Sequence, residues 1–529
     1  MTERWGMVID VNRCVGCQTC TAACKHENDT TPGVQWRRVL DVESGTFPDV
    51  ARLFLVVGCQ HCAEPPCVPV CPTGATRQRA DGLVTMDYDL CIGCGACAVA
   101  CPYQARTIVH EPGWYFGRDT VQERHAAHPE RTGVAQKCTF CVDKVDEAKR
   151  RGLTPGVDLE VTPAGAASCI AQAIQFGDLG DADSNVSRLL RDNPSFRMHA
   201  ELGTQPRIHY LYETPSVPGR EPAPEETEGE ALADPANPLV GAPQPFWDLR
   251  AAMNFVLGGL SSGLAVVAYL GHLSGAVPEA ALARIYALAA ALMAVGLLFV
   301  FLKLGRKLRF LYVLLRPQSS WMSRETYAVA AFYPAMAADL LWPSAPLHLL
   351  VAVAAAGFLY AQARILHAGK GVPAWRVPLM PWMLVGAGLY EGIAILALVH
   401  LALPGAVPPL LLAAGAGLAV ANAILWVAYV TGAHAAGIGP LSRRVLGALT
   451  PWLIGIGYAV PFLVYGLLLM QAAPPFAVIV LGVAAALAGG VSWKTVLVTR
   501  ACHQQGFALA RWPRRGSGSR AAPSSLSSA

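Results

Sequence analysis

The stretch CIGCGACAVACP, from Cys91 to Pro102, has four cysteines in the spacing C-x2-C-x2-C-x3-C, followed by a proline. In bacterial ferredoxins this spacing holds a [4Fe–4S] cluster through three close thiolates, and the fourth thiolate reaches a second cluster. The same spacing occurs in CVGCQTCTAAC at 14–24, and a related one occurs in CQHCAEPPCVPVCP at 59–72. These repeated groups predict a polypeptide that holds several iron–sulfur clusters.

A fourth cysteine group is incomplete. Cys138 and Cys141 form another C-x2-C pair, and Cys169 lies far downstream in SCIAQAIQFGD. Counting back four residues from Cys169 to the expected third ligand reaches Gly165, which has no side chain to bind iron. The fourth group is therefore one thiolate short.

The ferredoxin pattern pairs the first group with the fourth and the second with the third. It predicts four sets: the Cys14 set (Cys14, Cys17, Cys20 and Cys169), the three-cysteine set (Cys24, Cys138 and Cys141), the Cys59 set (Cys59, Cys62, Cys67 and Cys101) and the Cys71 set (Cys71, Cys91, Cys94 and Cys97). We expect three [4Fe–4S] clusters and one three-cysteine cluster, which is either a [3Fe–4S] cluster or an incompletely ligated [4Fe–4S] cluster. A damaged or absent cluster in the three-cysteine set is the alternative.

Structural zinc and disulfide bonds are the other uses of dense cysteines. Zinc binds C-x2-C pairs but does not need a further cysteine two residues on. The N-terminal sequence MTERWGMVIDVNRC has no apolar signal-peptide segment and no twin arginine, so we expect the cysteines in a reducing cytosol, where disulfides are rare. The chain also lacks a Ser-His-Asp set, a P-loop and a dinucleotide glycine motif, so this part is expected to conduct electrons without substrate chemistry of its own.

The composition divides the chain into four parts. Residues 1–215 hold fifteen of the sixteen cysteines, whereas 247–505 consist of long apolar runs. The Pro- and Glu-rich stretch 216–246 is predicted to be a linker, and 506–529 a disordered tail. We therefore expect an α+β double-ferredoxin-like iron–sulfur domain followed by an all-α polytopic membrane domain of eight transmembrane helices. The net charge of +4 comes largely from short loops between apolar runs, which indicates membrane orientation and no nucleic-acid partner.

Eight runs approach the roughly 20 apolar residues that cross a bilayer. They are 251–273, 282–302, 326–342, 346–366, 377–403, 407–431, 447–470 and 474–498, of which 326–342 is the shortest. The loops on one side carry nearly all the positive charge. By the positive-inside rule, the cysteine-rich domain and both ends of the membrane domain are expected on the cytoplasmic side of the cell inner membrane.

Residues 1–215 resemble the four-cluster iron–sulfur (DmsB-like) subunit of the dimethyl sulfoxide reductase superfamily. The resemblance rests on CVGCQTCTAACK, GVQWRRV, GCQHCAEPPCVPVCPTGAT, DGLVTMDYDLCIGCGACAVACPYQAR and KCTFCVDKV. The membrane part, with FVLGGLSSGLAV and LKLGRKLRFLYVLLRPQSSWMSRE, resembles the DmsC/NrfD-type quinone-reactive anchors. The resemblance implies a molybdopterin (Mo/W) catalytic partner and a membrane quinone. It also implies that the Cys14 cluster lies nearest the partner and the Cys91 cluster nearest the membrane.

Five residues of the membrane part are candidates for binding quinone or protons: Asn254, Trp321, Arg324, Glu325 and Glu391. The resemblance assigns Glu325 to the quinol region, whereas Lys303 stands where the related anchors usually have a histidine. Each candidate has a structural alternative: Asn254 as a helix-packing amide, Glu325 in an interfacial ion pair, and Glu391 as a protonated acid bonded to a neighbouring helix. Lys494 is expected to extend toward the membrane surface.

A heme b would need two histidines that face each other across the heme. His272, His348 and His400 are all expected near the outer face of the membrane. The inner side offers only His367 and His434, near loop ends, so the sequence contains no clear axial pair.

The sequence predicts a subunit that links a cytoplasmic catalytic subunit to the quinone pool. Because the cysteines are expected in the cytoplasm, oxidation of a cytoplasmic compound fits better than reduction of periplasmic dimethyl sulfoxide or polysulfide. The resemblance points to phenylacetyl-CoA:acceptor oxidoreductase and cytoplasm-facing sulfite dehydrogenase as nearest in kind. The alternatives are a redox-driven ion-translocating subunit with Glu391 as its ion site, a reductase that carries electrons from quinol to substrate, and a zinc-bound scaffold.

Overall fold

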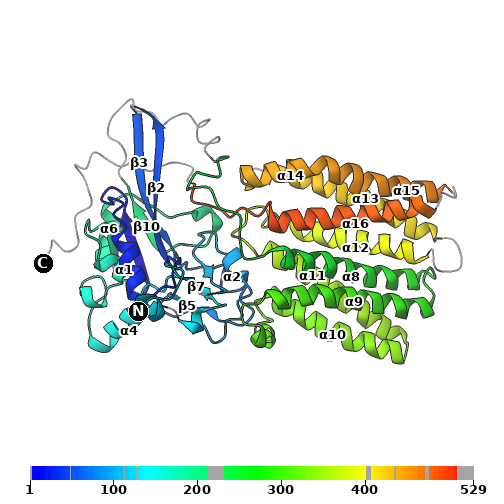
Figure 1. Cartoon of the computed structure of the whole chain (residues 1–529), viewed down its shortest axis with the longest axis horizontal. Helices are drawn as coiled ribbons and strands as arrows, with labels where there is room; N and C mark the ends of the chain where they lie inside the picture. Colours follow the sequence, from blue (N-terminus) through cyan, green and yellow to red (C-terminus); the bar gives the residue numbers. More distant parts are fainter. Residues whose placement is uncertain are drawn as a thin grey trace. The chain divides into compact units, whose positions relative to one another are not determined.

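The chain forms two compact units in a computed structural model that describes residues 3–47, 49–111, 113–126, 128–212, 232–400, 407–433, 437–470 and 476–508 (Figure 1). Unit 1 runs to Ala242 and resumes at Gln504, and unit 2 runs from Pro243 to His503. Residues 213–231 and 509–529, which include most of the predicted linker and tail, lie outside the described residues. The domain ranges given above remain predictions.

Unit 1 is built on a four-stranded sheet in the order β8-β1-β10-β9. Strand β1 (Trp5–Asp10) pairs in parallel with β10 (Ile208–Leu211) and antiparallel with β8 (Ile174–Asp178), and β9 (Ser195–Phe196) pairs antiparallel with β10. All six residues of β1, WGMVID, are buried, as expected of an apolar central strand. The sheet therefore joins the first strand of the chain to strands that follow the last cysteine group.

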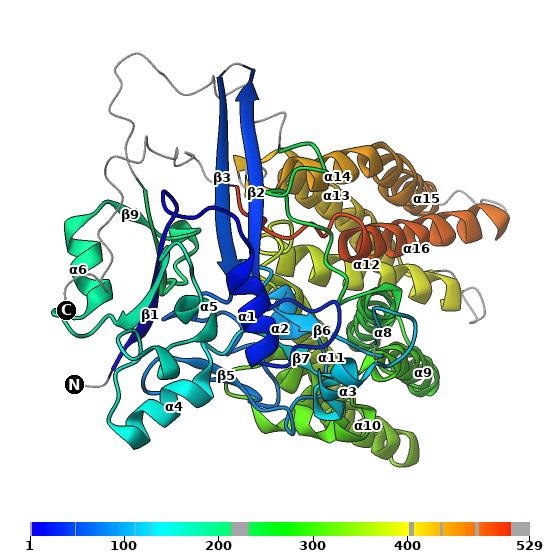
Figure 2. The ribbon, with the colours of Figure 1, turned by 60° about the vertical axis from the view of Figure 1, so that its left-hand side comes forward.

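Three hairpins accompany this sheet. The longest joins β2 (Arg37–Thr46) to β3 (Asp49–Gly58) and projects from the rest of unit 1 (Figure 2). The others join β4 (Thr76–Gln78) to β5 (Val84–Met86) and β6 (Thr107–Ile108) to β7 (Ala135–Gln136).

Short helices separate these strands. They are α1 (Thr19–Glu27), α2 (Ala96–Val99), α3 (Val121–Ala126), α4 (Val142–Arg151), α5 (Ala164–Ala167) and α6 (Asn185–Asp192). Three of them, α1, α2 and α4, begin within or directly after a cysteine group. Strands and short helices thus alternate around the cysteines, as the α+β expectation requires.

The chain returns to unit 1 after the last helix. The Gln504 amide donates to the carbonyl of Ala242 at 3.0 Å, and the Phe507 amide donates to the carbonyl of Leu239 at 2.7 Å. Phe507 is buried, and His199 Nε2 lies 3.0 Å from the carbonyl oxygen of Gly506. The two chain segments that flank unit 2 are therefore held together within unit 1.

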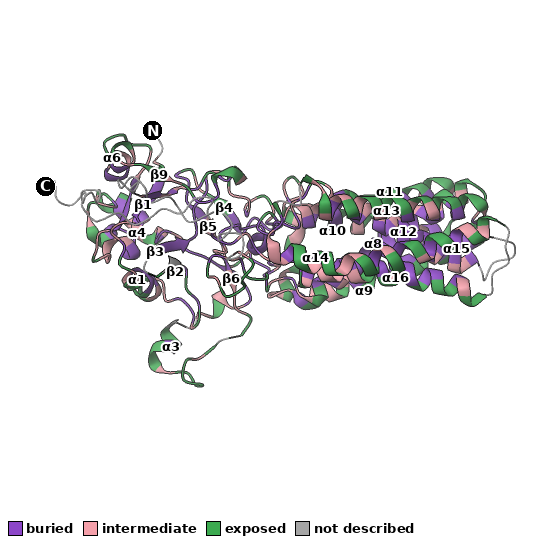
Figure 3. Cartoon of the chain, turned by 90° about the horizontal axis from the view of Figure 1, so that it is seen from above, coloured by how far each residue is buried: buried purple, intermediate pink, exposed green. Residues whose placement is uncertain are grey.

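Unit 2 is entirely helical in its described part, with its long helices side by side (Figure 1). Seven segments of the described chain are long and apolar enough to cross a membrane: α8 (Leu249–Leu273), α9 (Glu279–Lys303), α11 (Ala345–His367), α12 (Met380–His400), α13 (Pro409–Thr431), the composite Pro440–Leu469 and α16 (Phe476–Thr499). The composite consists of α14 (Pro440–Trp452), a π-helical stretch η6 (Leu453–Ala459) and α15 (Val460–Leu469). Exposed residues follow the outer faces of these helices and buried residues the inner faces (Figure 3).

The predicted eighth span, 326–342, is a helix, but it is not among these seven. Helix α10 (Trp321–Leu341) begins five residues earlier than predicted and follows a 3-10 segment, η4 (Lys307–Leu315). It carries Arg324, Glu325 and Asp339, which make it less apolar than its neighbours. Composition alone therefore supports seven spans and leaves the count of eight as a prediction.

Candidate metal centres and membrane site

The four C-x2-C turns share one backbone feature. The second residue after the first cysteine has a positive φ in every turn: Gly16 (70°), His61 (42°), Gly93 (69°) and Phe140 (58°). Glycine adopts this conformation freely, whereas His61 and Phe140 do so at a conformational cost. Their rings are stacked with centroids 3.8 Å apart, and this contact helps to hold both non-glycine turns.

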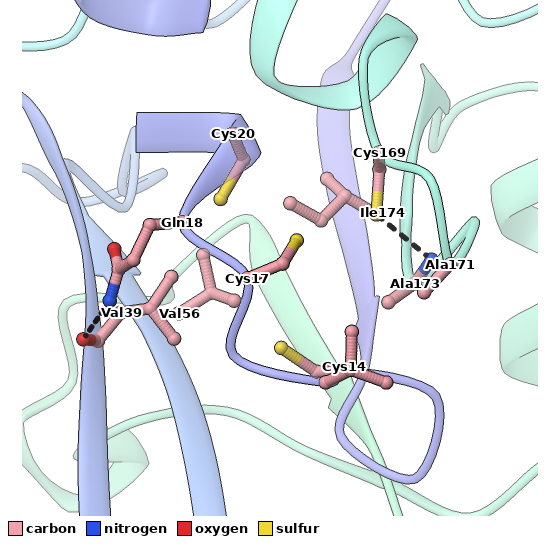
Figure 4. Close-up of a pocket in the computed structure, with 11 residues that line it drawn as sticks. Cys14, Cys17, Gln18, Cys20, Val39, Val56, Cys169, Ala171, Ala173 and Ile174 are labelled. Atoms are coloured by element: carbon pink, nitrogen blue, oxygen red, sulfur yellow. Dashed lines mark hydrogen bonds between the residues drawn. The ribbon is translucent and has the colours of Figure 1, made fainter. Parts of the chain in front are cut away.

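The Cys14 set lines one pocket (Figure 4). Cys14, Cys17 and Cys20 come from the loop and first turn of α1, and Cys169 comes from the turn after α5. The Ala173 amide donates to the Cys169 sulfur at 3.2 Å. Cys17 is exposed and Cys169 half-buried, so this set lies at the surface of unit 1.

The Cys59 set and the Cys71 set line two further cavities. Each cavity thus contains the four cysteines that the ferredoxin spacing groups, including the exchanged Cys101 and Cys71. Among the described residues, no three Cys, His, Asp or Glu side chains converge as ligands of a single metal ion would. Four soft sulfur donors around one space fit a cluster of several iron atoms.

The three-cysteine set is buried. The side-chain amide of Asn28 lies 3.8 Å from the Cys24 sulfur and 3.7 Å from the Cys141 sulfur, which brings the two segments together. Burial raises the pKa of Cys24, and the neighbouring Cys138 raises it further. A cationic metal would reverse this effect, because metal ligation requires the thiolate form.

Gly165 lies in α5, directly after Ala164, whose backbone forms a hydrogen bond with Cys141 of the three-cysteine set. A Cβ atom at this position would be 3.3 Å from the carbonyl oxygen of Cys20 and 3.5 Å from Cδ and Nε of Arg37. The glycine therefore leaves a small space that Arg37 borders.

Four buried polar side chains near the cysteines had no role assigned from the sequence: Arg37, His61, Arg106 and Lys137. Val84 N donates to His61 Nδ1 at 3.1 Å, so Nε2 carries the proton and donates to the carbonyl of Cys138 at 3.0 Å. Lys137 donates to the same carbonyl at 2.7 Å. Burial lowers the pKa of Lys137, and the sulfur of Cys59 acts in the opposite direction. Arg106 and Lys137 lie close to cysteines in the sequence, and this closeness is the signal by which they could have been found.

The predicted quinone residues fall into two groups in unit 2. Glu325 and Asn254 are buried, and the Glu325 carboxylate accepts hydrogen bonds from the side chains of Asn254 and Gln362. Gln362 also donates to the carbonyl of Asn254 at 2.8 Å. The structure thus brings Glu325 and Asn254 together and adds Gln362, which the sequence analysis missed.

Trp321 and Arg324 form the second group, at the start of α10. The Arg324 guanidinium lies 4.2 Å from the Trp321 ring centre, and that of Arg364 lies 4.9 Å from it. Arg324 also donates to the carbonyls of Pro317 and Gln318, so it holds the preceding loop and is not in an ion pair with Glu325 among the described contacts.

Glu391 forms a buried ion pair with Lys494. The Lys494 Nζ lies 2.8 Å from Glu391 Oε2, and the two side chains are 1% and 3% exposed. The expectation that Lys494 extends to the membrane surface is wrong, because its charge finds a partner inside the helical unit. Gly490 makes room for the acid: a Cβ there would lie 1.9 Å from Glu391 Oε1.

The outer histidines have structural partners. His348 Nε2 lies 3.1 Å from Asp339, and the His272 and His348 rings meet edge to face at 5.2 Å. His400 contacts the carbonyl of Ala276 at 3.0 Å. His434 lies outside the described residues.

Comparison with known proteins places unit 1 in a family. Residues 50–115 match the 4Fe-4S dicluster domain. A selenate reductase subunit of Mesobacillus selenatarsenatis is 39% identical over 224 residues, which are 39% of this chain and 72% of the relative. A sulfite dehydrogenase subunit of Allochromatium vinosum is 38% identical over 221 residues (39% and 81%), and protein NrfC of Escherichia coli is 38% identical over 208 residues (39% and 79%).

The chain belongs to the iron–sulfur subunit family of the dimethyl sulfoxide reductase superfamily. In this family the iron–sulfur subunit transfers electrons within an oxidoreductase complex, and the substrate chemistry belongs to another subunit. Each of these alignments covers about two fifths of the chain, whereas unit 2 adds seven helices with the length and apolar character of membrane spans. The protein therefore combines a family iron–sulfur subunit with a membrane region.

Proposed function

We propose that this chain is the electron-transfer and membrane-anchor subunit that links a cytoplasmic molybdopterin (Mo/W) catalytic subunit to the membrane quinone pool. The observation that carries the proposal is the presence, on one chain, of four cysteine sets and a helical unit with membrane-spanning character. An electron carrier fused to its own anchor needs no separate membrane subunit to reach quinone.

The cysteine sets would hold three [4Fe–4S] clusters and one three-cysteine cluster, which when bound carry single electrons through unit 1. The chain's own residues bind these clusters and exclude water, since all but Cys17, Cys94 and Cys169 of the fifteen are buried. Because Cys17 is exposed, we expect electrons from the partner subunit to enter at the Cys14 set. Val15 and Ile170 beside it are 47% and 71% exposed, and an exposed apolar rim of this kind suits a protein interface.

We assign the quinone end to the buried group of Glu325, Asn254 and Gln362. Quinone chemistry moves two electrons and two protons, so the site needs a group that exchanges a proton and donors that hold a carbonyl oxygen. Glu325 supplies the first, and the amides of Asn254 and Gln362 supply the second. Trp321 and Arg324 would shape the site from the cytoplasmic end of α10.

The predicted orientation favours one direction of electron flow, from substrate to quinone. The loops rich in Lys and Arg favour a cytoplasmic unit 1. A cytoplasmic catalytic partner fits oxidation of a compound confined to the cytoplasm, with phenylacetyl-CoA or sulfite as the candidate substrates. The similarity to a sulfite dehydrogenase subunit supports sulfite. Phenylacetyl-CoA is supported because a CoA ester is confined to the cytoplasm.

Purification of the full chain from its native membrane tests the proposal. We expect a brown protein whose broad absorbance bleaches with dithionite, together with a molybdopterin-containing subunit identified by mass. The complex should reduce a quinone analogue when supplied with substrate. A colourless protein that contains zinc would overturn the proposal.

The buried Glu391–Lys494 pair favours a second function, redox-driven ion translocation. A buried carboxylate paired with lysine is costly inside a membrane and is a functional candidate by default. Turnover of the complex in sealed liposomes with a membrane-potential dye would show a potential that Glu391→Gln abolishes while electron transfer continues.

A further inference from the structure

Unit 1 buries three cationic side chains among its cysteine sets: Arg37, Lys137 and Arg106 are 3%, 0% and 4% exposed. Burying a charge is expensive unless a partner of opposite sign compensates it. None of the three is in an ion pair with Asp or Glu among the described contacts of unit 1. The partners must therefore be found among the cysteines.

Arg37 faces two sets at once. It interacts electrostatically with Cys20 of the Cys14 set and with Cys24 and Cys138 of the three-cysteine set. Its Nη1 is buried and has no hydrogen-bond partner among the described residues. The side chain also borders the space beside Gly165, between the two segments that carry these cysteines.

Lys137 faces the next two sets. Its favourable electrostatic interactions are with Cys59 and Cys67 of the Cys59 set and with Cys138 of the three-cysteine set, and Arg106 is a neighbour of like charge. The ammonium donates to the carbonyls of Val84 and Cys138, and His61 donates to the second of these. These bonds fix the cation between the two sets.

Arg106 faces the last two sets. Its Nη2 donates to the Cys67 sulfur of the Cys59 set at 3.0 Å, and its Nη1 donates to Thr76 Oγ1 at 3.2 Å. It also interacts with Cys97 of the Cys71 set. The guanidinium borders the cavity of the Cys59 set.

We propose that each buried cation is shared by two cluster sites and raises the reduction potential of both. The inference rests on the proposed clusters. Each cluster held by thiolates gains one negative charge when it accepts one electron, and no bond forms or breaks. A nearby cation in a low-dielectric interior stabilises the reduced form more than the oxidised form. The three cations do not bind iron themselves, and they act on the clusters through their charge.

Redox titration followed by EPR on the purified full chain tests the inference. The variants are Arg37→Gln, Lys137→Met and Arg106→Gln. The [3Fe–4S] signal assigned to the three-cysteine set should move to lower potential in the first two variants and stay in place in the third. Each affected cluster should become at least about tenfold harder to reduce, which is about 59 mV for a one-electron couple.

Arg38→Gln is the matched control. Arg38 follows Arg37 on β2, but its guanidinium lies over the Phe507 ring, 5.9 Å from the ring centre. All four potentials should remain as in the unchanged protein. If a neutral variant loses its clusters, Arg37→Lys, Lys137→Arg and Arg106→Lys decide, because the retained charge should preserve both the clusters and their potentials.

The outcomes separate this inference from the proposed clusters. A [3Fe–4S] signal whose potential is equal in all the variants would overturn the inference and leave the cluster assignment intact. If the unchanged protein holds four [4Fe–4S] clusters, the three-cysteine assignment is wrong. In that case two of the four cluster potentials should fall in each neutral variant, and four constant potentials would overturn the role of the cations. If the cluster potentials of the charge-conserving variants differ from those of the unchanged protein, the proposed role of the cations is also wrong.

Discussion

At the scale of single residues, Gly165 separates the three-cysteine set from the other sets. The residue does not have a positive φ, and a Cβ would meet the Cys20 carbonyl at 3.3 Å and Arg37 at 3.5 Å. Small shifts accommodate contacts of this length. We therefore expect the position to accept a small side chain, and we predict that the absence of a thiol here leaves the three-cysteine set one ligand short.

We expect Gly165→Cys to convert the three-cysteine cluster into an ordinary [4Fe–4S] cluster. The new thiolate would supply the missing corner at the ferredoxin spacing. Low-temperature EPR of the air-oxidised protein should lose its [3Fe–4S] signal. Gly165→Ser is the control of similar size, and it should keep the signal because hydroxyl oxygen is a poorer iron–sulfur ligand. Four ordinary cubes in the unchanged protein would show that another residue completes the set.

Glu325→Gln should slow quinone-coupled turnover by on the order of 100-fold, a typical effect of removing a proton-transfer group. Turnover with an artificial dye at the catalytic partner should be unchanged, because that assay bypasses unit 2. Glu279→Gln, at the start of α9, is the matched acid-to-amide control and should affect neither assay. Equal losses in both assays for Glu325→Gln would place the residue in assembly instead of quinone chemistry.

The Glu391–Lys494 pair predicts a coupled effect on stability. Lys494→Met or Glu391→Gln alone leaves one buried charge unpaired, which costs about 3–5 kcal/mol. The double change removes both charges and should be less damaging than either single change. Thermal unfolding in detergent measures all three variants. Additive losses in the double variant would mean that the two groups do not depend on each other.

At the scale of elements, helix α10 decides how the chain crosses the membrane. Seven apolar segments would place the two ends of unit 2 on opposite sides. The segments on either side of unit 2 are joined by backbone hydrogen bonds within unit 1, between Gln504 and Ala242 and between Phe507 and Leu239. If both ends lie on one side of the membrane, the number of crossings is even, and we predict that α10 is the eighth.

Reporter fusions test this topology. A cytoplasm-sensing reporter at the C-terminus should be active, and a periplasm-sensing one there should be silent. A periplasm-sensing reporter placed between α10 and α11, at Pro343, should be active. Periplasmic activity at the C-terminus would overturn both the even count and the cytoplasmic position of unit 1.

At the scale of the whole molecule, the exposed rim of the Cys14 set is the expected docking site of the catalytic partner. Ile170→Glu should reduce the amount of catalytic subunit that co-purifies by at least about tenfold, since a charge at an apolar interface core is unfavourable. Val157→Glu, at a residue 60% exposed on the same unit, is the control and should retain the partner. Iron content should be equal in both variants. Full retention of the partner in Ile170→Glu would move the interface elsewhere.

Much of unit 1 and most helices of unit 2 could be predicted because their signals are local. The two-residue spacers place thiolates around one point, and three cavities of the structure are lined by the same cysteines that the spacing groups. Long apolar runs likewise mark most helices within about three residues of their observed ends, but the run predicted at 447–470 belongs to a segment that begins at Pro440. The weakest prediction is the span 326–342. The helix that contains it, α10, carries three charged side chains, two of which precede residue 326.

The sequence by itself determined which cysteines form sets and where the apolar helices run, and it predicts that position 165 lacks a ligand. Only the tertiary structure decided what the buried charges contact. Lys494 pairs with Glu391 across 103 residues, and Arg37 reaches cysteines from two separate segments. The physical reason is that ligand spacing and hydropathy act along the chain, whereas a buried charge is stabilised by whichever groups the packing brings within a few ångströms.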